Sequence, residues 1–204
     1  LVTNRLGRGA SAIVYRAESL GITRQFAVKL LDLSAHETAK DPEVLRERLN
    51  REVEAIGRLH NPHTVQFYDL LELRDGWVAI IMDFVDGQTL EDLVVRTRGL
   101  EVERALTLLR QIANGVHEVH EVGLIHRDLK PENLMVERLP AGDDFVHILD
   151  FGIVRIDEGV RVTQGFVGTP LYASPEQAIG GDIDRRSDIY SVGAILFFML
   201  TGRP

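Results

Sequence analysis

A short segment of the chain carries three polar groups of different chemistry. Asp128 offers a carboxylate, Lys130 an ammonium and Asn133 an amide, and Asp150 supplies a second carboxylate further along. Two carboxylates with an ammonium and an amide suit the transfer of a phosphoryl group from a metal-bound nucleotide to a hydroxyl. In such a transfer oxygen ligands hold the metal ion, and cations offset the phosphate charge. The sequence therefore predicts a phosphotransferase site built from these four residues.

The composition is that of an ordinary globular enzyme. The 204 residues are 45% hydrophobic and 26% charged, and this length allows one domain with two lobes. The net charge of −8 argues against a nucleic-acid groove. The chain has no cysteine, which excludes disulfides and thiolate metal sites and fits a reducing cytosol.

Neither a signal peptide nor a membrane span is indicated within this segment. The most apolar run, residues 189–200, is too short to cross a bilayer and suits a buried helix. We therefore expect a cytoplasmic protein, or the cytosolic domain of a larger, membrane-anchored one.

The expected strands and helices that would position these residues form two parts. Residues 1–85 are rich in strands, and residues 86–204 are mainly helical. β-branched and aromatic residues at 13–17 and 26–30 predict two strands around a turn at Gly21. Asp41-Pro42 predicts a helix start, and Asn61-Pro62 an end after about residue 59. Further strands are expected at 65–73 and 77–84, and further helices at 90–95, 102–122 and 188–200.

A glycine-rich turn follows another strand, which is expected to begin at Leu1. In the run Gly7-Arg8-Gly9-Ala10-Ser11-Ala12, glycine lets backbone N–H groups approach phosphate oxygens. The run also fits a dinucleotide-binding turn, with Asp32 as the ribose-binding acid. That fold requires a helix after the glycines, whereas residues 13–30 predict strand, turn and strand. A Walker-type loop is excluded because no Gly-Lys-Ser/Thr follows.

Several segments together resemble the eukaryotic-type serine/threonine protein kinases. They are His126-Arg127-Asp128-Leu129-Lys130-Pro131-Glu132-Asn133, Asp150-Phe151-Gly152, Phe26-Ala27-Val28-Lys29, Gly168-Thr169-Pro170 and Asp188-Ile189-Tyr190-Ser191-Val192-Gly193. Lys130 and Thr169 are typical of the serine/threonine branch. The string Ser174-Pro175-Glu176-Gln177 is most similar to bacterial members, with Ser174 where the family usually has alanine.

This resemblance implies an α+β fold of two lobes. Residues 1–85 would form a small antiparallel-sheet N-lobe with one helix and the hinge, and residues 86–204 a mainly helical C-lobe. The family normally continues with more helices after the position of Pro204, so we expect a C-terminally incomplete kinase domain.

The resemblance also implies roles for individual residues. Asp128 would act on the substrate hydroxyl, Lys130 on the transferring group, and Asn133 and Asp150 would bind Mg²⁺. Lys29 would hold the phosphates and pair with Glu52, with Glu54 as the alternative partner. Thr169 would border the substrate. The ATP-binding set would comprise Gly7, Gly9, Ala12, Val14, Ala27, Lys29, Met82, Asp83, Val85 and Met135.

The implied partners are ATP, Mg²⁺ and proteins that carry serine or threonine. Arg127 directly precedes the catalytic aspartate, as in kinases switched by activation-loop phosphorylation. Thr163 is the expected autophosphorylation site, and Arg48, Arg127 and Arg155 would meet its phosphate. If these arginines are instead solvated surface charges, Thr163 is an ordinary loop residue.

Two other function classes remain open, together with a metal-binding interpretation of the histidines. A pseudokinase scaffold would keep the fold without turnover, although Lys29, Glu52, Asp128, Asn133 and Asp150 are all intact. A small-molecule phosphotransferase of related fold normally lacks the kinase strings quoted above. The spacing of His117 and His120 does not match zinc proteases, so both are expected to be ordinary helix residues. His126 is expected to pack beneath the catalytic loop.

Overall fold

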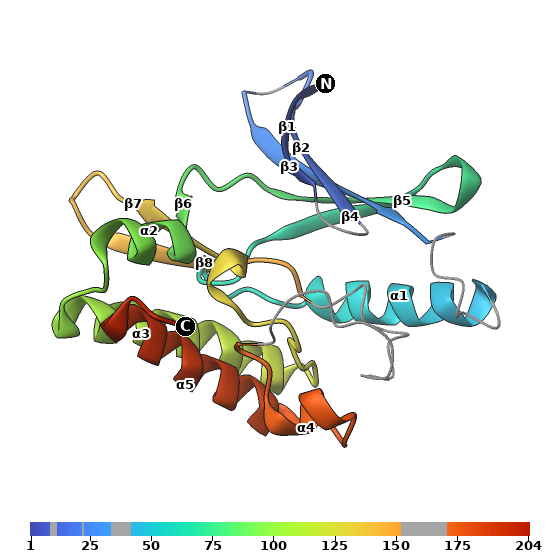
Figure 1. Ribbon diagram of the computed structural model, residues 1–204. Helices are drawn as coiled ribbons and strands as arrows, with labels where there is room; N and C mark the ends of the chain where they lie inside the picture. Colours follow the sequence, from blue (N-terminus) through green and yellow to red (C-terminus); the bar gives the residue numbers. More distant parts are fainter. Residues whose placement is uncertain (9–11, 22, 34–41, 152–170) are drawn as a thin grey trace. The chain divides into compact units, whose positions relative to one another are not determined.

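The computed structural model describes residues 1–8, 12–21, 23–33, 42–151 and 171–204, and omits the side chains of residues 42–46 and 48 (Figure 1). The chain forms two compact units. Unit 1 comprises Leu1–Arg58 and Val65–Val85, and unit 2 comprises Leu59–Thr64 and Asp86–Pro204. The short segment 59–64 thus belongs to the second unit, although the sequence placed all of residues 1–85 in one lobe.

Unit 1 contains a five-stranded antiparallel sheet in the order β1-β2-β3-β5-β4. Its strands are β1 (Val2–Arg8), β2 (Ala12–Glu18), β3 (Gln25–Asp32), β4 (Phe67–Glu72) and β5 (Trp77–Asp83), with the 3-10 turn η1 (Arg74–Gly76) between the last two. Along β3 the buried residues alternate, with Ala27, Lys29 and Leu31 pointing to one face. This period of two is that of a strand with one covered face, and it confirms the strands expected at 26–30 and 77–84.

Helix α1 (Pro42–Ile56) is the helix of unit 1, and it ends earlier than the sequence indicated. The predicted end near residue 59 is about three residues too late. The helix closes at Gly57, whose N–H donates to Val53 O at 2.9 Å. Beyond it, the backbone N–H groups of His60 and Asn61 donate to the Glu118 carboxylate at 2.9 and 2.8 Å. This side chain satisfies donors that a longer helix would have used.

Unit 2 combines a small sheet with helices. β6 (Gln88–Thr89), β7 (Leu134–Arg138) and β8 (Asp144–Ile148) pair antiparallel in that order. The helices are α2 (Leu90–Thr97), α3 (Val102–Glu121), α4 (Pro175–Ile179) and α5 (Arg185–Thr201), with the 3-10 turn η2 (Pro131–Asn133) before β7. Figure 1 shows α3 and α5 side by side, and both helices contribute to one core. That core includes Leu93, Leu108, Ile112, Val116, Leu134, Ile148, Ile195 and Met199.

Local chemistry sets the helix boundaries in unit 2. Thr89 caps α2 by accepting the Asp92 N–H at 3.0 Å. Asp184 caps α5 in the same way through Arg186 N–H at 2.8 Å, so this helix begins before the residue 188 that the sequence indicated. Packing around α3 is close at Gly115, where a Cβ would lie 2.6 Å from Ile148 Cδ1 and this methyl group would have to shift.

Within the part of the chain that the structure describes, none of the helices is both long and apolar enough to span a bilayer.

Candidate active site

The loop after α3 brings three of the predicted catalytic residues together. Asp128 Oδ2 lies 3.3 Å from Lys130 Nζ and accepts a hydrogen bond of 3.0 Å from Asn133 Nδ2. The same Asn133 amide donates to the Asp128 backbone carbonyl at 2.8 Å. Asn133 is buried, while the side chains of Asp128 and Lys130 are partly exposed. The carboxylate is therefore oriented from two sides and still reachable by a substrate.

The chemistry of Asn133 and Asp150 fits a hard divalent cation. Because the amide NH₂ of Asn133 points to Asp128, its side-chain oxygen is the atom that could bind a cation. Leu149 N–H donates to Asn133 O at 2.8 Å, which brings the residue preceding Asp150 against η2. Amide and carboxylate oxygens are the ligands that Mg²⁺ prefers, with phosphates and water completing its shell.

His126 lies beneath this loop, as the sequence indicated. Its ring is fully buried, packs 5.3 Å from the Phe151 ring, and places Nε2 3.0 Å from Leu149 O. The carbonyl can only accept, so Nε2 carries the proton, and Nδ1 accepts the Asp128 N–H at 3.3 Å. Burial lowers the pKa of His126 despite nearby carboxylates and its bond to Leu149, which favours this neutral form.

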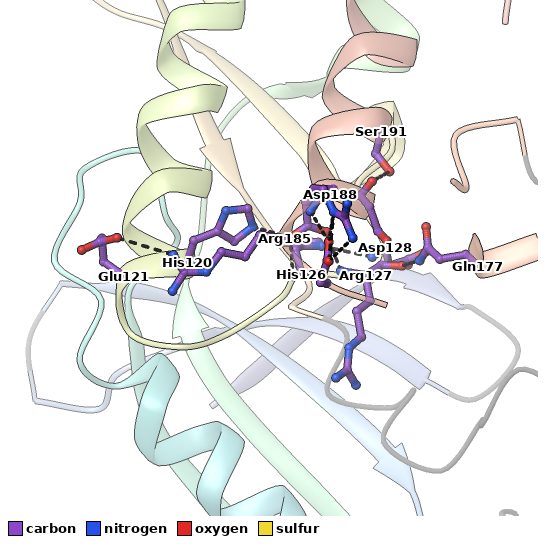
Figure 2. A network of polar contacts seen from close by, with 12 residues as sticks. His120, Glu121, His126, Arg127, Asp128, Gln177, Arg185, Asp188 and Ser191 are labelled. Atoms are coloured by element: carbon purple, nitrogen blue, oxygen red, sulfur yellow. Dashed lines mark hydrogen bonds and ion pairs between the residues drawn. The ribbon is translucent and has the colours of Figure 1, made fainter. Parts of the chain in front are cut away.

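Asp188, in the first turn of α5, holds the backbone of the same loop (Figure 2). Its carboxylate is 1% exposed and accepts the N–H groups of His126 at 2.8 Å and Arg127 at 2.9 Å. His120 Nε2 approaches the same carboxylate at 2.7 Å. The expectation that His120 is an ordinary helix residue is wrong, because it is buried and supports Asp188. Ile112, Val116 and Val119 mark the buried stripe of α3, and position 120 extends that stripe.

In unit 1, one sheet face carries several residues predicted to bind nucleotide. Lys29 is 8% exposed and lies opposite Val14, while Ala27 lies opposite Met82. Directly opposed residues share a face, and Ala27 and Lys29 are two apart on β3, so all four point the same way. Gly7 pairs with Val14 from β1.

The two candidate partners of Lys29 lie in different surroundings within α1. Glu52 is partly buried. Glu54 is exposed and forms an ion pair of 2.6 Å with Arg58, one turn further along. Because Glu54 pairs with Arg58 at the surface, Glu52 is the favoured candidate for the partner of Lys29.

The remaining predicted nucleotide-binding residues are divided between the units. Asp83 and Val85 end unit 1, and Met135 lies on β7 of unit 2, opposite His147. The Asp83 N–H donates to Gln66 O at 3.0 Å, so this N–H is not the group that would meet a base. Its carboxylate is bound by Arg24 and Tyr68, each at 2.9 Å.

Some predicted residues lie outside the described part of the chain. They are Gly9, Arg155, Thr163, Thr169 and the side chain of Arg48.

The comparisons with known proteins bear on this arrangement. The family model described as "Protein kinase domain" matches residues 2–204. The chain belongs to the protein kinase family. "Serine/threonine-protein kinase pkn3" of Myxococcus xanthus is 39% identical over 203 residues, which are 97% of this chain and 36% of that protein. "Serine/threonine-protein kinase PknH" of Mycobacterium tuberculosis is 38% identical over 201 residues, with 98% and 31% covered.

The likeness extends to a solved structure. The crystal structure of Rad53 1-466 in complex with AMP-PNP matches 99% of this chain and 48% of its own, with 27% identity and a TM-score of 0.78. The predicted α+β kinase fold is thereby confirmed. This kinase chain spans about a third of the length of the two curated relatives named above.

Proposed function

We propose that this chain is a serine/threonine protein kinase that transfers the γ-phosphoryl group of ATP to protein hydroxyls in bacterial signalling. The observation that carries the proposal is the Asp128 carboxylate, which lies between Lys130 Nζ at 3.3 Å and the Asn133 amide at 3.0 Å. The family and its curated relatives support the reaction class. Lys130 and Thr169 support the serine/threonine branch.

Asp128 would orient the substrate hydroxyl and receive its proton as the oxygen attacks. The bond that its Oδ2 accepts from Asn133 would fix the carboxylate in place for this contact. Lys130, beside the same carboxylate, would offset charge on the transferring phosphoryl group. Because phosphoryl transfer needs little covalent chemistry from the protein, positioning and electrostatics account for the rate.

Asn133 and Asp150 would hold Mg²⁺, which when bound would neutralise charge between the β- and γ-phosphates. Lys29 would bind the α- and β-phosphates, and Glu52 would fix its ammonium. The sheet face of Val14, Ala27 and Met82 would contact the adenine together with Met135, and the hinge backbone at Val85 would hydrogen-bond it. The backbone from Gly7 through Gly9 to Ala12 would cover the phosphates.

We propose two features beyond the reaction itself. Thr163 would be autophosphorylated, and Arg127, Arg155 and Arg48 would bind its phosphate and order the loop. The domain would work in the cytosol, where ATP and Mg²⁺ are available. Both proposals come from the sequence, and the Thr163 proposal rests on residues outside the described part.

The decisive experiment compares Asp128→Asn with Asp143→Asn in the natural full-length protein. Asp143 is an exposed residue of unit 2, so its substitution makes the same charge change away from the site. Asp128→Asn should lower kcat by about two to four orders of magnitude, while the Kd for Mg-ATP stays within about twofold. Asp143→Asn should behave like the parent. Equal turnover in the two variants would contradict the role of Asp128.

The molecule that accepts the phosphoryl group distinguishes the remaining function classes. Labelled ATP is offered with a generic basic protein, or with a panel of small alcohols and amines. A protein kinase labels serine and threonine of the protein, a small-molecule phosphotransferase labels the panel, and a pseudokinase binds ATP without labelling either.

A further inference from the structure

The backbone of Arg127, one residue before Asp128, lies in the left-handed region with φ of 63°. A non-glycine residue in that region stores strain, and it persists where surrounding bonds fix it. The Arg127 N–H donates to Asp188 at 2.9 Å. The Arg127 carbonyl accepts a bond of 2.8 Å from Gln177 Nε2. Both polar groups of this residue's backbone are therefore held by side chains from distant parts of unit 2.

The amide of Gln177 is fixed in one orientation by its second contact. Gln177 is 7% exposed and lies in α4, where its Oε1 accepts the Ser174 backbone N–H at 3.0 Å. An N–H requires an acceptor, so the amide oxygen must face Ser174 and the NH₂ must face the Arg127 carbonyl. Glutamate could make the first contact but would place an oxygen against that carbonyl.

Helix α4 is itself fastened to the rest of unit 2. The Ser187 hydroxyl donates to the Glu176 carboxylate, and Ser187 is buried in the first turn of α5. Figure 2 shows Gln177 reaching from α4 toward the loop of Arg127 and Asp128, and Asp188 of α5 binding the same loop. The carbonyl that Gln177 holds belongs to the peptide bond that joins Arg127 to Asp128. A shift of α4 would therefore move this peptide bond through one hydrogen bond, and the carboxylate of Asp128 would move with it.

We propose that Gln177 is a positioning residue for phosphoryl transfer, which locks the Arg127–Asp128 peptide and couples α4 to the catalytic carboxylate. This inference rests on the proposed kinase function. A displacement of about 1 Å at a reacting group can cost roughly a hundredfold in rate, so a single lost bond at this peptide is sufficient to be measured. Gln177 does not itself touch the substrate in this proposal.

The competing explanation is that Gln177 serves only as part of the helix cap. Ser174 and Gln177 form a reciprocal capping box, in which Ser174 Oγ accepts the Gln177 N–H at 3.4 Å. Ser174→Ala removes that bond but keeps both contacts of the Gln177 side chain. Gln177→Glu keeps an acceptor for the Ser174 N–H and removes the donor to Arg127. Comparing Ser174→Ala with Gln177→Glu therefore distinguishes a role of Gln177 in the helix cap from a role in holding the loop.

The experiment measures three quantities in the parent, Gln177→Glu, Gln177→Met and Ser174→Ala. They are kcat with the KM for ATP, the melting temperature, and amide hydrogen exchange of His126, Arg127 and Asp128. Gln177→Met makes an apolar replacement of similar length, in case a buried carboxylate prevents folding.

Both Gln177 variants should lower kcat by about 10- to 100-fold, with the KM for ATP within about twofold, and should speed exchange at Arg127 and Asp128. Ser174→Ala should keep kcat within about threefold and leave that exchange unchanged, even if it melts at a lower temperature. The proposal is overturned if a folded Gln177 variant keeps parental kcat and exchange, or if Ser174→Ala loses kcat equally. A parent without kinase activity would refute the proposed function, and the exchange data alone would then decide whether Gln177 holds the loop.

Discussion

His120 Nε2 lies 2.7 Å from the Asp188 carboxylate. This contact joins α3 to Asp188, which holds the catalytic-loop backbone. His120→Phe would remove this donor from a carboxylate that is almost fully buried. We expect the free energy of unfolding to fall by about 1–3 kcal/mol, with a smaller kcat because Asp188 is less well fixed. Urea unfolding measures the first effect. His117→Phe is the matched control, since His117 is exposed on the same helix and should change stability by less than about 0.5 kcal/mol.

Acid should destabilise the protein partly through His126. Burial keeps the pKa of His126 below its ordinary 6.5 in the folded state, so below that pH the unfolded chain binds more protons than the native one. The stability that His126 contributes is fully present above pH 6.5, and it declines as the pH falls from there toward the lowered folded-state pKa. The slope for one group is at most about 1.4 kcal/mol per pH unit.

Urea titrations of the parent and His126→Gln between pH 5 and pH 8 test this dependence. The variant should show a shallower loss of stability below pH 6.5. His63 also has a lowered pKa, because burial outweighs its bond to Val146, so part of the slope should remain. Parallel curves for the two proteins would show that folding does not lower the pKa of His126.

Asp150→Asn should weaken nucleotide binding and phosphoryl transfer together. The change removes a charged oxygen ligand from a hard cation, and both steps depend on that cation. Titrating ATP with and without Mg²⁺ should show a strong magnesium effect on Kd in the parent and a much smaller one in the variant. Asp182→Asn, an exposed position of unit 2, serves as the control. The same magnesium dependence in Asp150→Asn and the parent would exclude Asp150 as a metal ligand.

Thr163 should carry phosphate after incubation with Mg-ATP, and mass spectrometry can locate it. Thr163→Ala should lower activity toward other proteins, because the arginines then have no phosphate to bind and the loop is not ordered. A catalytically dead Asp128→Asn sample should lack the phosphate if the reaction is autophosphorylation. A fully active parent with unmodified Thr163 would refute this switch and leave the kinase proposal intact.

The sequence alone predicts that Ala27 and Lys29 share one face of a sheet. The β-branched and aromatic run around these two residues indicates a strand, and side chains two apart on a strand must point the same way. The structure adds the register, which sets Val14 opposite Lys29 and Met82 opposite Ala27. Register depends on pairing between strands, so a single strand's sequence does not contain it.

The sequence also predicts the residues of the site, because Asp128, Lys130 and Asn133 lie close together along the chain. Their hydrogen bonds span at most five residues, so a local turn brings the groups together once the loop forms. Residue type and spacing are sufficient to predict which side chains meet, and the chemistry follows from those types.

The kinase resemblance implies that the buried aspartate at position 188 holds the loop backbone, whereas the other supports of that loop were decided by tertiary structure. Asp188 reaches Arg127 across 61 positions, His120 reaches Asp188 across 68, and Gln177 reaches Arg127 across 50. The apolar period of α3 places His120, and not His117, on its buried face, but nothing local names the partner of His120 or makes Gln177 a donor to a particular carbonyl. Such bonds exist because helix packing buries these polar groups, and a buried polar group must find a partner wherever the fold places one. The sequence determined the reacting groups, and the packing of α3, α4 and α5 decided how the loop that carries them is held.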